Sequence, residues 1–468
     1  MKHYVEQMYT GCLAEAAYYI ESNGEAAIID PLREVEPYIQ KAKERGAQIK
    51  YVFETHFHAD FVSGHLDLAK KTGAKIVYGP TAEPNFDAYI AKDGEEFKIG
   101  NIIIKALHTP GHTLESTTYL LIDEEGKERY IFTGDTLFIG DVGRPDLAVK
   151  GNLTEKELAG LLYESLRNKI LTLPDDVIVY PGHGAGSACG KNIGKETFDT
   201  LGNQKKKNWA LQNISKENFI KEATTGLLPP PQYFPKNALL NKLGYESIDN
   251  IIEREYIPLG VEEFKEKMKS GALVLDTRSP QDFANGHIPG SINIGLDGGP
   301  FAVWVGALIE DLKTPILLVT PEGREKEAII RLARVGYENC LGYLEGGMLA
   351  WQNAGEKIAD IHQIDAAEFA KRYKAENITV IDVRKPTEYE KSHLDKAKNI
   401  PLDFIQKHLH EFSKNEKYYI HCAGGYRSMI ASSILKRNGI ENIVDVKGGY
   451  SAISQQEGLP LVEIACSC

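Results

Sequence analysis

The stretch Glu54-Thr55-His56-Phe57-His58-Ala59-Asp60-Phe61 decides how the first half of this 468-residue chain is interpreted. The apolar residues that lead into it predict a strand over Tyr51 to Thr55, which opens directly into the two histidines. A His-x-His pair leaving a strand places two imidazoles near one point, and Asp60 adds a carboxylate oxygen two residues later. These residue types predict a transition-metal site at the end of a strand.

Four further segments with polar side chains also follow predicted strands or lie in turns that contain glycine. Glycine allows the backbone to bend neighbouring side chains toward a shared centre. Imidazole with carboxylate is a ligand set for zinc, iron or manganese and not for calcium. The segments are Thr109-Pro110-Gly111-His112-Thr113, Thr133-Gly134-Asp135, Gly143-Arg144-Pro145-Asp146 and Tyr180-Pro181-Gly182-His183.

Short apolar runs alternate with amphipathic stretches, which predicts an α/β chain of several domains. Helices are expected over 35–45 and 66–71, ended by Gly46 and Gly73. Strands are expected at 26–30, 76–77, 102–104, 118–122 and 130–132.

Composition excludes several classes of protein. The apolar fraction of 42% is ordinary for a globular protein, and the net charge of −12 argues against a nucleic-acid partner. No apolar run has the length of a membrane span, and the N-terminus does not have the pattern of a signal peptide. The six scattered cysteines do not form a disulfide framework, so we expect reduced thiols and a cytoplasmic location.

The second half of the chain contains an internal repeat. The proline-rich stretch 228–235 marks the approach to a domain boundary, and beyond it Val274-Leu275-Asp276-Thr277-Arg278 recurs as Val380-Ile381-Asp382-Val383-Arg384. Glu345-Gly346-Gly347 recurs as Lys447-Gly448-Gly449. The period is that of a small domain, so we expect domains at 1–250, 255–358 and 359–468.

The order of His56-x-His58-x-Asp60, His112, Asp135 and His183 resembles the metallo-β-lactamase superfamily over about residues 1–250. The resemblance implies an αββα sandwich with the metal site at its strand ends. Many members hold two zinc ions, and in them another histidine follows the acidic residue of the first motif. Phe61 occupies that position here and cannot ligate a metal, which favours a mononuclear site.

Within that superfamily the chain is more similar to persulfide dioxygenases. In that family two histidines and one aspartate hold iron, and the matching positions are His56, His112 and Asp135. The resemblance therefore implies one Fe(II) per chain, with zinc as the alternative, and open coordination positions for a thiol and O₂. His58, Asp60 and His183 would then orient the ligands or bind a second metal. The similarity is carried by 54–61, Gly134-Asp135-Thr136-Leu137-Phe138, Gly143-Arg144-Pro145-Asp146-Leu147 and Gly184-Ala185-Gly186-Ser187-Ala188-Cys189-Gly190.

Residues after these ligands are candidates for binding the substrate. A guanidinium pairs well with carboxylates, and similar enzymes use the arginine at the position of Arg144 near glutathione. Tyr180 precedes the last histidine turn, and Gly184 and Gly186 offer backbone N–H groups that suit a substrate wall. Cys189 in the same loop is interpreted as structural.

The second repeat contains Ile420-His421-Cys422-Ala423-Gly424-Gly425-Tyr426-Arg427-Ser428, followed by a predicted helix from Met429 to Arg437. A cysteine between a strand and a helix N-terminus gains aligned N–H groups that stabilise a thiolate and a persulfide. The pattern resembles rhodanese sulfurtransferases over about residues 360–460, and Cys422 is the position that carries persulfide sulfur there. Arg427 adds positive charge for an anionic sulfur compound, so Cys422 and Arg427 are the candidate catalytic residues. A related phosphatase is the alternative, but its loop is usually one residue longer.

The first repeat lacks this thiol. Aligning its Gly-Gly pair with that of the second repeat puts Thr320 opposite Cys422, and Glu322 and Glu325 add negative charge. We therefore expect an inactive rhodanese-like module that serves packing, docking or spacing. At the chain end, Cys466 and Cys468 either relay sulfur or are merely exposed to oxidation.

Together these features predict an enzyme that oxidises a low-molecular-weight thiol persulfide, with glutathione persulfide as the expected substrate, to sulfite with O₂. Transfer of sulfane sulfur through Cys422 would link persulfide, sulfite and thiosulfate in sulfide detoxification. The alternative is a di-zinc thioester hydrolase similar to glyoxalase II, with a sulfur-carrier C-terminal half. The sequence leaves the carrier thiol and the direction of the sulfur transfer open. It also leaves the oligomeric state open, a homo-oligomer being one alternative.

Overall fold

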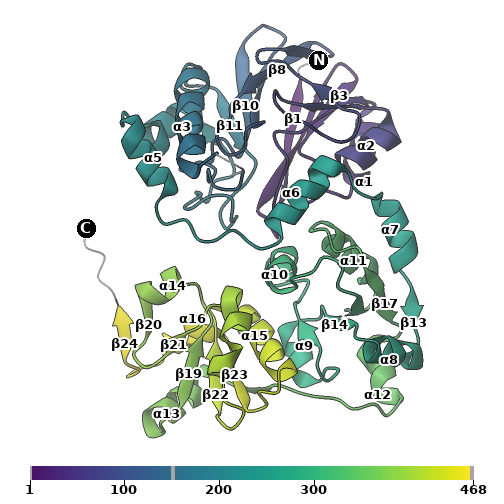
Figure 1. Cartoon of the computed structure of the whole chain (residues 1–468), viewed down its shortest axis with the longest axis vertical. Helices are drawn as coiled ribbons and strands as arrows, with labels where there is room; N and C mark the ends of the chain where they lie inside the picture. Colours follow the sequence, from purple (N-terminus) through teal and green to yellow (C-terminus); the bar gives the residue numbers. More distant parts are fainter. Residues whose placement is uncertain (1–2, 149–152, 464–468) are drawn as a thin grey trace. The chain divides into compact units, whose positions relative to one another are not determined.

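The chain divides into two units in the computed structural model, which describes residues 3–148 and 153–463 (Figure 1). The first unit comprises Met1–Ile251 with Ala333–Gly336, and the second comprises Ile252–Leu332 with Tyr337–Cys468. Cys466 and Cys468 lie outside the described residues. Within residues 3–148 and 153–463, no helix combines the length and the apolar character needed to cross a membrane.

Two six-stranded sheets form the centre of the first unit. The first contains, in order, β1 (Tyr4–Thr10), β2 (Glu15–Ser22), β3 (Glu25–Ile29), β4 (Gln48–Phe53), β5 (Lys75–Tyr78) and β6 (Tyr89–Ile90). The second contains, in order, β12 (Asp199–Thr200), β11 (Ile178–Pro181), β10 (Glu128–Gly134), β9 (Thr117–Ile122), β8 (Ile102–His108) and β7 (Glu96–Ile99).

The two faces of each sheet bury apolar side chains in different cores. Along β2, Tyr18 and Ile20 belong to the core between the sheets, whereas Ala17 and Tyr19 pack with residues of α1 (Glu36–Arg45) and α2 (His65–Thr72). Helices α3 (Glu155–Ser165) and α5 (Lys216–Thr224) cover the outer face of the second sheet (Figure 1). These layers confirm the predicted αββα sandwich. The unit also contains α4 (Leu201–Lys207), α6 (Phe234–Leu243) and the beginning of α7 (Ile248–Glu255).

Two helices end where the sequence predicts, whereas one strand ends earlier than predicted. Gly46 and Gly73 end α1 and α2 in left-handed conformations, with φ of 69° and 73°, as predicted. Strand β4 ends at Phe53, two residues earlier than predicted. The Thr55 N–H donates to the Asp30 carboxylate at 2.8 Å, so this residue leaves the strand ladder and enters the loop that carries the histidines.

The second unit contains two five-stranded sheets whose strands are all parallel. The first has the order β13 (Pro258–Leu259), β17 (Cys340–Leu344), β16 (Ile316–Val319), β14 (Leu273–Asp276) and β15 (Ile292–Asn293). The other has the order β18 (His362–Ile364), β23 (Ile443–Val446), β22 (Tyr418–His421), β19 (Thr379–Asp382) and β21 (Lys398–Asn399).

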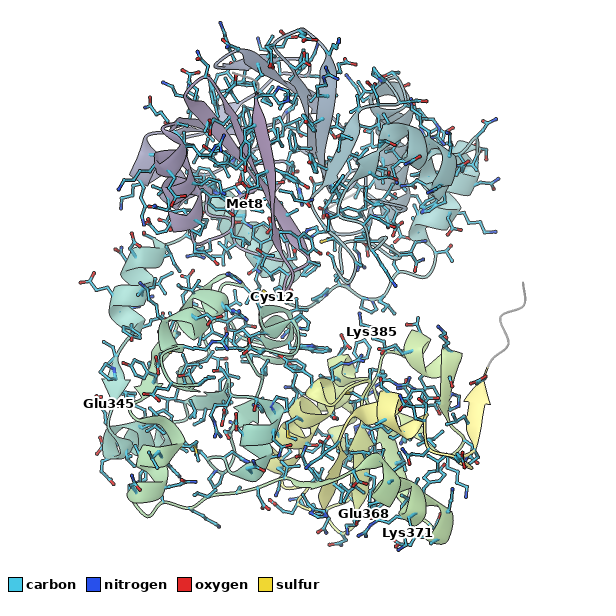
Figure 2. The ribbon with its side chains drawn as sticks, turned by 180° about the vertical axis from the view of Figure 1, so that it is seen from behind. Met8, Cys12, Glu345, Glu368, Lys371 and Lys385 are labelled. Atoms are coloured by element: carbon cyan, nitrogen blue, oxygen red, sulfur yellow. The ribbon has the colours of Figure 1, made fainter. Side chains whose placement is uncertain are left out.

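The same strand order appears twice, which is the structural form of the repeat seen in the sequence. The first module contains α8 (Val261–Lys269), α9 (Pro280–Asn285), α10 (Phe301–Leu308), α11 (Glu325–Ala333) and α12 (Gly347–Asn353). The second contains α13 (Ala366–Ala375), α14 (Pro386–Lys391), the 3-10 helix Leu402–Glu411, α15 (Tyr426–Arg437), α16 (Gly449–Ile453) and an antiparallel pair, β20 (Ser392–Leu394) with β24 (Leu461–Glu463). Glu368 and Lys371 are exposed on α13, whose other side packs in the module core (Figure 2).

The repeated Asp-x-Arg motif forms the same ion pair in both modules. Arg278 pairs with Asp276, and Arg384 with Asp382, each with a shortest N–O distance of 2.6 Å. Both aspartates are fully buried, so each arginine satisfies a carboxylate that would otherwise be costly to bury.

The turn that precedes His112 lies directly against the backbone of α3, and this contact generates a prediction. A Cβ at Gly111 would lie 2.3 Å from the Leu162 Cβ, and the Gly111 φ of 149° disfavours other residues. We expect Gly111→Ala to destabilise the first unit by about 2–3 kcal/mol through overpacking. A lower midpoint of its thermal transition in circular dichroism would show this.

Gly11→Ala is the matched control, because a Cβ at Gly11 meets no atom within 4 Å. Equal midpoints for the two variants would contradict the prediction.

Candidate functional site

The structure brings the predicted metal ligands together at the strand ends of the first unit. His56, His112 and Asp135 are buried and offer ligand atoms that lie within 4.8 Å of one another. The Nε2 atoms of His56 and His112 lie 3.8 Å and 3.3 Å from Oδ2 of Asp135. Two imidazoles and one carboxylate thus converge on one point.

Hydrogen bonds at Nδ1 orient two of the histidines. Nδ1 of His112 lies 2.9 Å from the carbonyl oxygen of Arg144, and Nδ1 of His183 lies 3.1 Å from that of Ala14. Since a carbonyl can only accept, each Nδ1 carries the proton and donates. In the neutral ring this leaves the lone pair on Nε2, which is the tautomer that metal coordination requires.

Nδ1 of His56 also carries a proton and donates it, in this case to a hydroxyl group. The Thr55 hydroxyl donates to the Asp30 carboxylate at 2.8 Å, so it accepts from Nδ1 of His56 at 3.0 Å. Burial, followed by the neighbouring imidazoles, lowers the pKa of His56 well below its usual range. The neutral ring leaves Nε2 available to a metal.

The Asp135 carboxylate shows that this group of residues fits a metal ion. Both of its oxygens are buried, and neither has a hydrogen-bond partner among the residues that the structure describes. Oδ1 lies 3.5 Å from Nε2 of His183, whereas the other oxygen, Oδ2, faces His56 and His112. A buried carboxylate without donors is costly unless a cation compensates it. The nitrogen and oxygen donors suit iron or zinc.

A second group of side chains adjoins the first. His58, Asp60 and His183 offer ligand atoms within 4.8 Å of one another, and Nε2 of His183 lies 3.4 Å from Asp60. Phe61 packs its ring on His58, with 4.4 Å between the centroids, where a further histidine would serve a second metal. The group therefore retains fewer nitrogen donors than a complete di-zinc site.

His58 is tied to carboxylates that the sequence analysis did not assign to the site. Its Nε2 lies 3.0 Å from Asp30 and 3.5 Å from Glu54. Burial disfavours the charged ring, but these carboxylates outweigh burial and raise the pKa of His58 to about 10. Asp30 and Glu54 both lie at the ends of predicted strands, as His56 does. This position in the sequence could have identified them as residues of the site.

Cys189 also lies closer to the metal group than the sequence indicated. Its sulfur belongs to a set with Asp135 and His183 in which all ligand atoms lie within 4.8 Å. Burial, then Asp60 and Asp135, raises the pKa of the Cys189 thiol. No sequence motif of metal-ligand spacing marks this residue.

The predicted substrate-binding arginine is engaged within the first unit. Arg144 is buried, and its Nε and Nη2 donate to Asp146 at 2.7 Å each. Nη1 and Nη2 also donate to the carbonyl oxygens of Ala188 and Leu228. Arg144 therefore holds three loops together around the site, and a contact with substrate stays a prediction.

The other predicted substrate contacts lie nearby in different settings. Tyr180 stacks on the rings of Tyr130 and Phe132, at interplanar angles of 17° and 13°. A Cβ at Gly184 would lie 2.4 Å from the Tyr9 hydroxyl, whereas Gly186 has open space around it. Contacts of Tyr180, Gly184 and Gly186 with a substrate stay predictions.

The second candidate site is the loop after β22 in the second unit. Cys422 is buried, and its Sγ accepts a hydrogen bond from the Gly425 N–H at 3.0 Å. The carbonyl oxygens of Cys422 and Ala423 accept from the N–H groups of Tyr450 and Ser451, at 2.6 Å and 3.0 Å. The loop therefore directs a backbone donor at the sulfur, and α15 begins three residues earlier than predicted.

Arg427 is the second residue of α15, directly after this loop, and it is not a free cation. Its Nη1 and Nη2 donate to the Glu388 carboxylate at 2.6 Å and 2.8 Å. A sulfur anion at this position would have to share the guanidinium with Glu388. The role of Arg427 toward an anion stays a prediction.

Thr320 occupies the corresponding position in the first module. It directly follows β16, which takes the place in its sheet that β22 takes in the other. Arg324 in the next turn pairs with Asp297 and Glu327. Among the described residues, this loop contains no thiol.

Comparison with known proteins agrees with both parts of the fold. The metallo-beta-lactamase superfamily model matches residues 10–183, and the rhodanese-like domain model matches residues 260–354 and 365–456. A metallo-beta-lactamase structure from Staphylococcus aureus is 33% identical with a TM-score of 0.66, and the match covers 73% of this chain and 98% of that one.

Curated relatives carry two different names. A probable hydroxyacylglutathione hydrolase of Schizosaccharomyces pombe is 33% identical over 38% of this chain and 66% of its own length. The human mitochondrial persulfide dioxygenase ETHE1 is 32% identical over 44% of this chain and 74% of its own length. The match thus spans just under two thirds of the yeast relative and about three quarters of the human one. The chain belongs to the metallo-β-lactamase superfamily and carries two rhodanese-like domains behind the metallo-β-lactamase domain.

Proposed function

We propose that the chain is a persulfide dioxygenase joined to a sulfurtransferase, with domains at 1–250, 255–358 and 359–468. The observation that carries the proposal is the buried group of His56, His112 and Asp135, whose carboxylate oxygens have no hydrogen-bond partner in the part of the chain that the structure describes. The similarity to ETHE1 supports the dioxygenase, and the rhodanese-like domains support sulfur transfer. We propose one Fe(II) per chain at this group.

His56, His112 and Asp135 would hold the iron, which would supply the oxygen-activating chemistry that oxidation of a persulfide sulfur needs. The overall reaction is RSSH + O₂ + H₂O → RSH + SO₃²⁻ + 2H⁺, in which the outer sulfur is oxidised and O₂ is reduced. Asp135 contributes the negative charge, and the Nδ1 hydrogen bonds hold the two imidazoles in the ligating tautomer. Phe61 is buried against His58 and contributes no donor to the site.

Cys422 would transfer the sulfane sulfur. Its thiolate attacks the outer sulfur of RSSH, the S–S bond of the donor breaks, and RS⁻ leaves. Sulfite then attacks the outer sulfur of the Cys422 persulfide, which forms thiosulfate and returns the thiolate. The Gly425 N–H that lies 3.0 Å from Sγ stabilises negative charge on the sulfur in both steps.

A thioester hydrolase with two zinc ions is the second candidate. The group of His58, Asp60 and His183 favours it, because Asp135 lies between this group and the first. A relative named hydroxyacylglutathione hydrolase also matches at a similar identity to ETHE1. Metal content and oxygen consumption separate the two candidates.

The first prediction concerns the metal and the reaction. Purified protein should contain about one iron ion per chain and consume O₂ with glutathione persulfide while sulfite forms. Elemental analysis, an oxygen electrode and quantified sulfite check this. Two zinc ions per chain, with cleavage of a glutathione thioester and no O₂ uptake, would falsify the proposal.

The second prediction concerns the ligands. His112→Ala removes a proposed ligand, so it should lower bound iron and oxygen uptake by at least about tenfold. His362→Ala removes an exposed histidine elsewhere and serves as the control, with iron content unchanged. Full retention of iron in the His112 variant would show that the ligands are wrongly assigned.

The third prediction separates the two chemistries. Cys422→Ser removes the proposed sulfur carrier, so thiosulfate formation should be lost while oxygen uptake and sulfite release remain. Cys12→Ser is the control for the loss of a thiol outside the loop. Unchanged thiosulfate formation in the Cys422 variant would assign the second unit a carrier or docking role instead.

A further inference from the structure

The first rhodanese-like module contacts the persulfide loop of the second through a set of glycines. The segment 295–299 lies between β15 and α10, and the ring of Tyr426 rests against it. A Cβ at Gly299 would lie 2.4 Å from this ring, and Cβ atoms at Gly298 and Gly295 would lie 3.4 Å and 3.5 Å from it. The Tyr426 hydroxyl donates to the carbonyl oxygen of Gly295 at 2.7 Å. The three glycines and this carbonyl form a cradle for one tyrosine, which we call the glycine cradle.

Tyr426 is connected to the Cys422 sulfur through a single residue. It is the first residue of α15, and Gly425 before it has a φ of 109°, a conformation that leaves its N–H 3.0 Å from Sγ. A shift of the tyrosine ring would move the Tyr426 backbone and, through the φ and ψ angles of Gly425, the preceding Gly424–Gly425 peptide group that carries this N–H. The direction of the N–H donor therefore depends on where the cradle holds the ring.

The rest of α15 rests on the same module. Met429 packs in a small core with Phe283, Ala284 and Ile361. The Asn293 N–H of β15 donates to the Ser433 hydroxyl at 3.0 Å. The helix is thus buried between its own sheet and the first module, and both its start and its middle are held from outside its own module.

We propose that the first module, which has no thiol at Thr320, acts as the template that positions the Cys422 loop, with Tyr426 as the positioning residue. The proposal rests on the sulfurtransferase role of Cys422 and names what that site requires beyond its own module. A purely apolar contact would fix the distance between the modules. The phenol–carbonyl bond adds a fixed position for the far end of the ring, and this restricts the backbone from which the Gly425 N–H is directed at Sγ.

Two variants test the positioning role in the full chain. Tyr426→Phe keeps the ring and removes its hydrogen bond to Gly295, and Gly299→Ala places a methyl group where the ring lies. Gly260→Ala is the control in the same module, because a Cβ there meets nothing within 4 Å. Three readouts are needed: kcat and KM for thiosulfate formation, the pH profile of Cys422 alkylation by iodoacetamide, and the thermal midpoint. Subtracting the alkylation of Cys422→Ser isolates the signal of this thiol.

We expect Tyr426→Phe to lower kcat about fivefold, the factor that one lost hydrogen bond represents, with KM nearly unchanged and the thermal midpoint lowered by at most a few degrees. The alkylation profile should move to higher pH. Gly299→Ala should have a larger effect. In a Tyr426→Ala background the same glycine change should cost almost nothing further, because the ring it displaces is gone.

The proposal is overturned if both single variants keep the control's kcat and alkylation profile, or if only the thermal midpoint moves. Additive effects of Gly299→Ala and Tyr426→Ala would also overturn it. Because alkylation requires no sulfur donor, it reports on the loop even if Cys422→Ser shows that the proposed sulfur transfer is wrong. The two failures are therefore distinguishable.

Discussion

The buried carboxylate of Asp135 is the constraint around which the first unit is arranged. It directly follows β10, and its two oxygens have no hydrogen-bond partner among residues 3–148 and 153–463. Each oxygen instead faces imidazole nitrogens, His56 and His112 on one side and His183 on the other. The imidazoles are held from behind by backbone carbonyls and a threonine hydroxyl. The polar groups thus leave a deficit of positive charge at one point, which is the electrostatic condition for binding a cation.

The second unit has the opposite electrostatic requirement, because its candidate site must stabilise negative charge on a sulfur instead of binding a cation. Cys422 also follows a buried strand, but here the backbone supplies a donor to the sulfur and the start of a helix lies behind it. In both units the rigid sheet fixes the position of the reactive group, and the loop after the strand fixes its surroundings. The metal group depends on side chains from distant strands, whereas the sulfur depends on a few consecutive peptide groups.

Much of this was predictable from the sequence, because periodicity and glycines report on local structure. The helix ends at Gly46 and Gly73 and the repeated module follow from such patterns, whereas the αββα layers were expected from the resemblance to the metallo-β-lactamase superfamily. The roles of Asp30 and Glu54 were missed, since a carboxylate that ends a strand looks the same whether it pairs with a histidine or with water. The pairing of Arg144 with Asp146 and of Arg427 with Glu388 was also missed. The sequence shows that an arginine is present, but it does not show whether a neighbouring carboxylate already compensates the charge of its guanidinium group.

The two Asp-x-Arg ion pairs have a consequence for how the chain arose. Asp276 with Arg278 and Asp382 with Arg384 occupy equivalent strand ends and have the same 2.6 Å geometry, although one module has a threonine where the other has the thiol. Such a match in strand order and internal pairing is what a gene duplication leaves behind. The ion pair is present whether the loop that follows the neighbouring strand begins with threonine or with cysteine, so it maintains the frame of the module independently of the thiol. A duplicated domain can in this way keep its fold while the loop after its central strand changes.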